Sequence, residues 1–80
     1  MLKTKLKAPV ILNLITRRNL SQNWLAHRMG ISKAYLSQLI TGARTASPKT
    51  RRLFLEYFNE LSFDDLFEIE PDEKAANSND

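Results

Sequence analysis

The chain of 80 residues contains no cysteine. Disulfide bonds and thiolate metal sites are therefore excluded, and we expect a protein of a reducing compartment. Its longest apolar stretch, residues 10–15, is interrupted by Asn13 and is shorter than the ~20 residues of a membrane-spanning helix. No segment resembles a signal peptide. The sequence thus predicts a cytoplasmic protein without a membrane partner.

Glycine is almost as scarce, since the chain has only Gly30 and Gly42. Each follows a run with helical apolar spacing, and glycine ends a helix at little cost because it adopts left-handed backbone angles. Ser21 and Ser32 precede the two runs and are favoured N-cap residues. We therefore predict two short helices, one ending at Met29 and one ending at Thr41, joined by a tight turn at Gly30.

Acidic residues are absent from the first part of the chain. Between Met1 and Arg52 there are eleven Lys and Arg residues and no Asp or Glu, whereas the remainder holds nine acidic residues and one lysine. The two parts therefore carry net charges of +11 and −8. A surface of one sign recruits a partner of the other sign, so the basic part predicts a polyanion as partner.

The apolar spacing is helical almost throughout, and only residues 2–7 alternate with the period of a strand. A helix is expected from Pro9 to Arg18, another after Ser47 and Pro48, and a short one after Ser62. We interpret residues 1–8 as a basic N-terminal arm, residues 9–70 as one all-α domain of five helices, and residues 71–80 as a disordered acidic tail.

Two short helices joined at a glycine are typical of a helix-turn-helix. Counting from Gln22, the small residue Ala26 stands four positions on and Gly30 eight positions on. The segment LSQNWLAHRMGISKAYLSQLITGAR resembles the helix-turn-helix of the phage repressor, Cro and Xre family of bacterial transcription regulators. The resemblance covers about residues 10–67 and implies a compact lambda-repressor-like domain. It also implies a sequence-specific regulator of double-stranded DNA, a repressor that binds a palindromic operator as a homodimer in the bacterial or phage nucleoid.

The second helix of this motif carries the residues that would read bases. Leu36, Leu39 and Ile40 share one face, so the outward face and the N-terminal tip hold Lys33, Ala34, Ser37, Gln38 and Thr41. Gln38 can pair with adenine, Lys33 can donate to guanine, and Ala34 can touch a thymine methyl group.

Phosphate contacts are expected at helix starts and in the loop after the second helix. Cations in a first helical turn oppose the helix dipole, and a DNA phosphate would offset that cost. The resemblance places Gln22 at such a phosphate. The predicted phosphate-binding residues are Gln22, Asn23, Ser32, Tyr35, Arg44, Lys49, Arg51 and Arg52.

Other functions find less support in the sequence. His27 is the only histidine, and no nucleophile and base can be paired with an orienting third group, so we expect no enzyme and no cofactor. Asp64, Asp65 and Glu68 are explained by the dipole of a helix start rather than by a metal. Two alternatives remain open. One is an antitoxin-like or accessory protein whose acidic C-terminal segment binds a protein partner, and the other is an architectural excision or replication factor.

The predicted homodimer requires an interface. We expect it on the short fifth helix, around Phe63 and Phe67.

Overall fold

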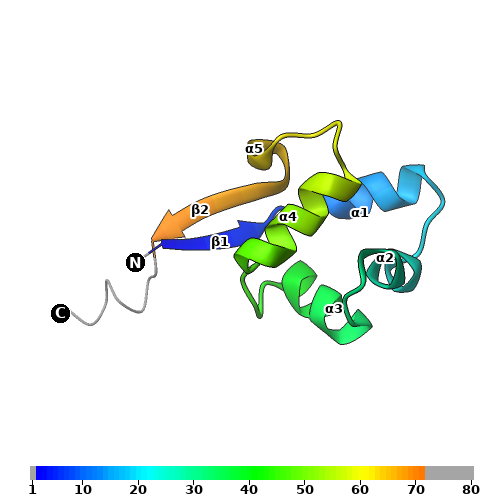
Figure 1. The fold of residues 1–80 in the computed structure, drawn as a ribbon, viewed down its shortest axis with the longest axis horizontal. Coiled ribbons are helices and arrows are strands. Elements are labelled where there is room, and N and C mark those ends of the chain that lie inside the picture. Colours follow the sequence, from blue (N-terminus) through cyan, green and yellow to red (C-terminus); the bar gives the residue numbers. More distant parts are fainter. Residues whose placement is uncertain (1, 72–80) are drawn as a thin grey trace.

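The fold was obtained as a computed structural model, which describes residues 2–71 (Figure 1). Along the chain the elements are strand β1 (Leu2–Leu6), helices α1 (Ala8–Arg17), α2 (Gln22–Met29), α3 (Lys33–Thr41), α4 (Pro48–Tyr57) and α5 (Phe63–Leu66), and strand β2 (Phe67–Pro71). In Figure 1 the helices form one body, and the two strands form a ribbon that projects from it. The five expected helices are present, with α1 shifted by one residue at each end.

The ribbon corrects the prediction of an all-α fold. β1 pairs with β2 in antiparallel fashion, with Leu2 opposite Pro71 and Leu6 opposite Phe67. Residues 2–6, expected as part of a basic arm, are thus a strand, and their alternation matches it because Thr4 and Leu6 are buried. Strand β2 includes Pro71, which was expected in the acidic tail. The other residues of that tail, 72–80, lie outside the described part of the chain.

The second strand escaped prediction because its first residue also fits a helical pattern. Phe67 follows Phe63 at the spacing of one helical turn, yet its backbone is extended, with φ −134° and ψ 157°. It places its side chain in the core, where its ring meets that of Phe54 edge-on at 5.8 Å between centroids.

Every helix and strand contributes to a single hydrophobic core. Its buried members are Leu6, Ile11, Ile15, Leu25, Ala26, Met29, Leu36, Leu39, Ala46, Phe54, Phe58, Leu66 and Phe67. Each large side chain of this kind contributes ~1.5–3 kcal/mol when fully buried. The core therefore joins the ribbon to the helices and holds α2, α3 and α4 against one another.

Four serines begin four of the helices, as predicted. The hydroxyl oxygens of Ser21, Ser32, Ser47 and Ser62 each accept a hydrogen bond from the backbone N–H three residues later. At α5 the bond is reciprocal, because the Asp65 carboxylate accepts from the backbone N–H of Ser62 at 2.9 Å. Each cap satisfies a donor that the helix cannot satisfy itself.

The turn between α2 and α3 has the predicted geometry. Gly30 adopts φ +74° and ψ 27°, in the left-handed region. The N–H of Ile31 donates to the carbonyl of Ala26 at 3.0 Å, and the N–H of Gly30 donates to that of His27 at 3.1 Å. These two bonds close the end of α2 as a Schellman motif. The left-handed residue redirects the chain, so that only three residues lie between the end of α2 and the start of α3.

Candidate DNA-binding surface

Helix α3 is held against the body of the domain by one face. Leu36 and Leu39 are buried on this face. They belong to the same buried cluster as Leu25 and the small residue Ala26 of α2. A small side chain at such a crossing lets two helices approach closely. The packing fixes which side of α3 faces solvent.

The outward side of α3 carries the residues predicted to read bases. All five are exposed, namely Lys33, Ala34, Ser37, Gln38 and Thr41. No acidic residue lies on this helix, so nothing on its surface would repel a phosphate backbone. Within residues 2–71, no hydrogen bond reaches the side chain of Ser37 or Gln38. The Gln38 amide therefore presents its donor and its acceptor to a ligand.

Thr41 differs from the other four. Its hydroxyl donates to the carbonyl of Gln38 at 3.2 Å and accepts from the backbone N–H of Ala43 at 3.4 Å. The hydroxyl thus satisfies backbone groups at the end of α3. The methyl group is the part of the Thr41 side chain that no hydrogen bond engages.

The sequence of this region decides the family. A sequence model with the description "helix-turn-helix" matches residues 11–66, which is more than half of the chain. The chain belongs to the Cro, C1 and Xre type of helix-turn-helix proteins. Members of this family are DNA-binding regulators and are generally not enzymes. No curated protein and no solved structure matches the chain.

In this helix-turn-helix protein, three helix starts are suited to phosphate. The first turns of α1, α2, α3 and α4 contain no acidic residue, whereas that of α5 contains Asp64 and Asp65. Of these four starts, those of α2, α3 and α4 also carry residues predicted to bind phosphate. A helix N-terminus without an acid leaves its positive end available to an anion. Most of the residues predicted to bind phosphate are exposed there or in the loop after α3, namely Asn23, Ser32, Arg44, Lys49 and Arg52, and Gln22 is half-buried.

Two predicted phosphate ligands are also engaged inside the protein. The guanidinium of Arg51 donates to the hydroxyl of Thr4 at 2.7 Å and so joins α4 to β1. The Tyr35 hydroxyl lies 3.1 Å from that of Thr50, which in turn accepts from the Ser47 hydroxyl at 3.0 Å. This chain of hydroxyls connects α3 to the first turn of α4.

The environment of Tyr35 changes its acidity. Burial raises the pKa of Tyr35, but hydrogen bonds to Thr50 and Ser47 and the charge of Arg44 outweigh burial, so the pKa lies below its ordinary value. Sequence reasoning missed Thr50 and Thr4 as positioning residues. Thr50 had a signal, because it stands three residues after the N-cap Ser47, whereas Thr4 had none, because its partners lie more than 40 residues away.

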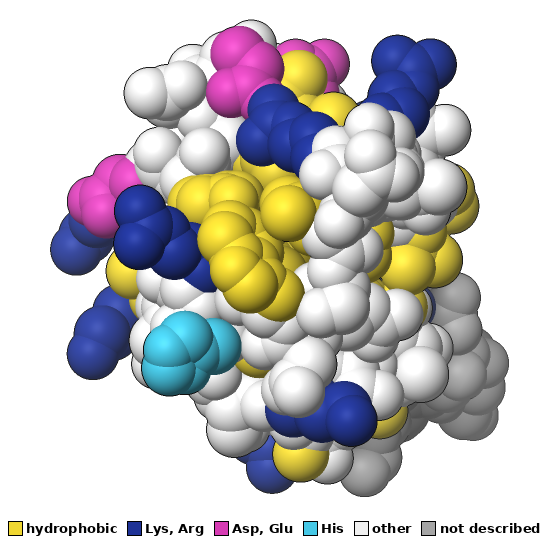
Figure 2. All heavy atoms as spheres, turned by 90° about the vertical axis from the view of Figure 1, so that its right-hand side faces the viewer, with side chains coloured by type: hydrophobic (Ala, Val, Ile, Leu, Met, Phe, Trp, Pro, Cys, Tyr) yellow, Lys and Arg dark blue, Asp and Glu magenta, His cyan; other side chains and the backbone are white. Residues whose placement is uncertain are grey.

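Basic and acidic side chains are separated in space as well as in sequence. Figure 2 shows acidic side chains at the top and upper left of one face, and only Lys, Arg and His side chains among the charged ones in its lower part. The described acids lie on α4, on the turn after it, on α5 and on β2. The lysines at the start of the chain do not form a free arm, because Lys5 of β1 pairs with Glu70 at 3.1 Å and Lys7, just after β1, donates to the carbonyl of Asp64 at 2.7 Å.

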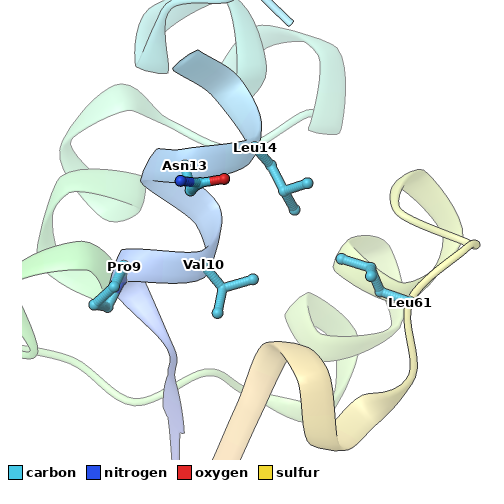
Figure 3. A pocket seen from close by; sticks show the side chains of 5 residues that line it. All are labelled: Pro9, Val10, Asn13, Leu14 and Leu61. Atoms are coloured by element: carbon cyan, nitrogen blue, oxygen red, sulfur yellow. The ribbon is translucent and has the colours of Figure 1, made fainter. Parts of the chain in front are cut away.

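The expected dimer interface needs a correction. Phe67 is 1% exposed and belongs to the core, so it cannot contact a second copy, whereas Phe63 is half-buried and packs against it with 5.2 Å between ring centroids. An apolar hollow of about 330 Å³ lies nearby, between α1 and the chain before α5. Its lining residues are Pro9, Val10, Asn13, Leu14 and Leu61 (Figure 3).

The remaining expectations concern metal, membrane and His27. Within residues 2–71, Asp64, Asp65 and Glu68 form no group suited to a metal ion, and no other such group of His, Cys, Asp or Glu is present. None of the helices in this range has the length and apolar character needed to cross a bilayer. His27 is exposed on α2.

Proposed function

We propose that this helix-turn-helix protein is a sequence-specific repressor of transcription that binds a palindromic operator in double-stranded DNA as a homodimer. The observation that carries the proposal is the outward face of α3, which has five exposed residues and no acid, together with the acid-free first turns of α2, α3 and α4. Such a helix fits the major groove, where side chains reach base edges.

The residues of α3 differ in what they can read. Gln38 can form two hydrogen bonds with an adenine, because its side-chain amide has no partner within the described protein. Lys33, at the first position of α3, can donate to a guanine. Ala34 and the methyl group of Thr41 offer apolar contacts to thymine methyl groups. Lys49, Arg52 and Arg44 would hold the phosphates that set this register.

Selection of bound sequences from a random pool of DNA would test this proposal. A shared palindromic motif is the expected result. On the selected site, Gln38→Ala should cost ~1–3 kcal/mol and relax the preference at one base position, while binding to random DNA stays unchanged. Asn59→Ala is the matched control, because Asn59 is exposed on the turn after α4, far along the chain from α3. An equal loss on selected and random DNA would remove Gln38 as a base reader.

A homodimer would give α3 enough base contacts for specificity. Two-fold symmetry places two recognition helices in successive turns of the major groove, ~34 Å apart. The apolar hollow beside α1 supports an interface there, since a second copy would bury Val10, Leu14 and Leu61. Leu61→Glu should then convert a dimer to a monomer in sedimentation experiments. Leu12→Glu, on α1 outside the hollow, should not. A wild-type protein that is monomeric both free and on its operator would contradict this part of the proposal.

Repression itself is tested in cells. A reporter promoter that overlaps the selected operator should lose expression when the protein is produced, and Gln38→Ala should restore it. Increased expression would show an activator, and unchanged expression with bound DNA would favour an architectural role.

A further inference from the structure

The two-stranded ribbon has two edges, and only the edge formed by β2 is open. Figure 1 shows β1 on the side of the ribbon that faces α3 and α4, whereas α5 adjoins the end of β2. On the β1 side, the backbone N–H of Ala46 donates to the carbonyl of Thr4 at 3.1 Å, so the chain before α4 covers that edge. Within the described part of the chain, the only backbone hydrogen bond that joins β2 to an element other than β1 runs from the Phe67 N–H to the Phe63 carbonyl of α5, so no strand or loop pairs with the corresponding edge at Ile69.

The register shows which backbone groups this edge presents. Because Thr4 directs its carbonyl at Ala46, it points away from β2, and Thr4 and Ile69 are a pair without hydrogen bonds between them. Pairs in an antiparallel ladder alternate in this way, so the N–H and C=O of Ile69 also point outward. Pro71 has no N–H to offer, and its register position directs its nitrogen outward, which explains why proline is tolerated there.

The side chains around this edge are of two kinds. Ile69 is 55% exposed and shares a face with Leu2, which is 69% exposed. Glu68 and Glu70 occupy the opposite face of the same strand. The edge therefore combines unpaired backbone groups with an apolar side and an acidic side.

The strand β1 indicates which kind of strand β2 accepts. Lys5 stands opposite Glu68 and Lys3 stands opposite Glu70, while apolar Leu6 stands opposite Phe67. Lys5 also pairs with Glu70 at 3.1 Å. Opposite charges across a ladder stabilise it, and the same pattern would suit a strand added on the free side of β2.

We propose that the outer edge of β2 binds an extended segment of another protein in which Lys or Arg alternates with apolar residues. The backbone N–H and C=O of Ile69 would pair with the segment, as in other cases of strand addition. Its basic side chains would lie beside Glu68 and Glu70, and its apolar side chains would cover Ile69 and Leu2. This binding is independent of DNA recognition by α3.

A second copy of the chain suits this edge poorly. The outward-pointing positions are 67, 69 and 71, so any two-fold antiparallel pairing of β2 with itself sets a glutamate of one copy opposite a glutamate of the other. Like charges directly opposite one another destabilise a ladder. Pro71 also shortens the edge, which limits the growth of longer sheets.

The test uses the full chain and random linear peptides displayed on phage. Enriched peptides should carry Lys or Arg at every second position and apolar residues between them. Binding of a synthetic enriched peptide should shift the Ile69 amide signal in NMR spectra and slow its hydrogen exchange. Ile69→Pro removes the outward N–H without removing a hydrogen bond to β1. It should therefore lower the affinity for the enriched peptide by about tenfold or more.

Charge is tested separately. Glu68→Lys should weaken the enriched peptide about tenfold at low salt, with a smaller effect at high salt. Glu56→Lys makes the same charge change on the exposed surface of α4 and should have little effect. All three variants should bind the selected operator like the wild type, which separates this proposal from that of a repressor.

Four results would overturn the proposal. The first is the absence of any enriched peptide, and the second is enrichment of peptides without alternating basic residues. The third is equal affinity of the enriched peptide for Ile69→Pro and the wild type. The fourth is self-association of the wild type that Ile69→Pro abolishes, because a second copy would then occupy the edge.

Discussion

Replacement of Gly30 isolates the backbone strain of the turn between α2 and α3. At φ +74° a Cβ added to Gly30 would meet no atom within 4 Å, so steric contact with the rest of the protein adds nothing to the cost. Left-handed backbone angles destabilise the folded state by ~1–2 kcal/mol for an L-residue. Replacement of glycine also lowers the entropy of the unfolded chain, which offsets ~0.4–1 kcal/mol of that loss. Gly30→Ala should therefore destabilise the domain by about 1 kcal/mol.

A β-branched residue should cost more. Strained backbone positions cost up to ~3 kcal/mol, and we expect Gly30→Val to destabilise by about 2 kcal/mol. Gly30→Asn should cost least, because asparagine enters the left-handed region most readily among the non-glycine residues. Each kcal/mol corresponds to ~4–8 °C in melting temperature for a domain of this size, which thermal unfolding followed by circular dichroism resolves easily.

Gly42 provides the matched control. It closes α3 at φ +86°, and an added Cβ there also meets nothing within 4 Å. The same three substitutions should therefore give the same order of stabilities at both glycines. Equal stability of Gly30→Val and wild type, or a cost of Asn as large as that of Val, would refute the reasoning that backbone angles alone make glycine necessary.

Four further predictions concern other parts of the fold. Asn19 has φ +57° and closes α1, so Asn19→Gly should leave thermal stability equal or higher, and a large loss would contradict this. Arg51→Ala should lower the free energy of unfolding in urea by about 1 kcal/mol because Thr4 loses its partner. Arg52→Ala should leave that free energy within ~0.5 kcal/mol but weaken specific and random DNA alike and reduce the salt slope by about one. Hydrogen bonds from the backbone and side chain of Ser62 hold the pKa of Asp65 below its ordinary value. The stability from this group is therefore complete above its unfolded pKa and is lost as the pH falls through the lower folded pKa, so urea midpoints should depend less on acidic pH in Asp65→Asn than in the wild type.

The sequence by itself determined the helices and the outward face of α3. Serine N-caps and glycine helix ends form hydrogen bonds with residues three to five positions away. The roles of Ser32, Gly30 and Gly42 can therefore be predicted without knowledge of the tertiary structure. The side of α3 opposite Leu36 and Leu39 follows from helical periodicity alone. The separation of charge is also a property of the sequence, because the acidic residues follow the helix-turn-helix.

The tertiary structure decided the ribbon and everything that depends on it. Residues 2–6 and 67–71 pair across almost the whole described chain, and no local rule relates two segments so far apart. For the same reason, the Arg51–Thr4 hydrogen bond and the pairing of Lys5 with Glu70 could not be predicted, because both join residues far apart in the sequence. The residues around Phe67 in the sequence are compatible with either a short helix or a strand. It becomes a strand residue because only the extended backbone lets it enter the core beside Phe54 while β2 pairs with β1.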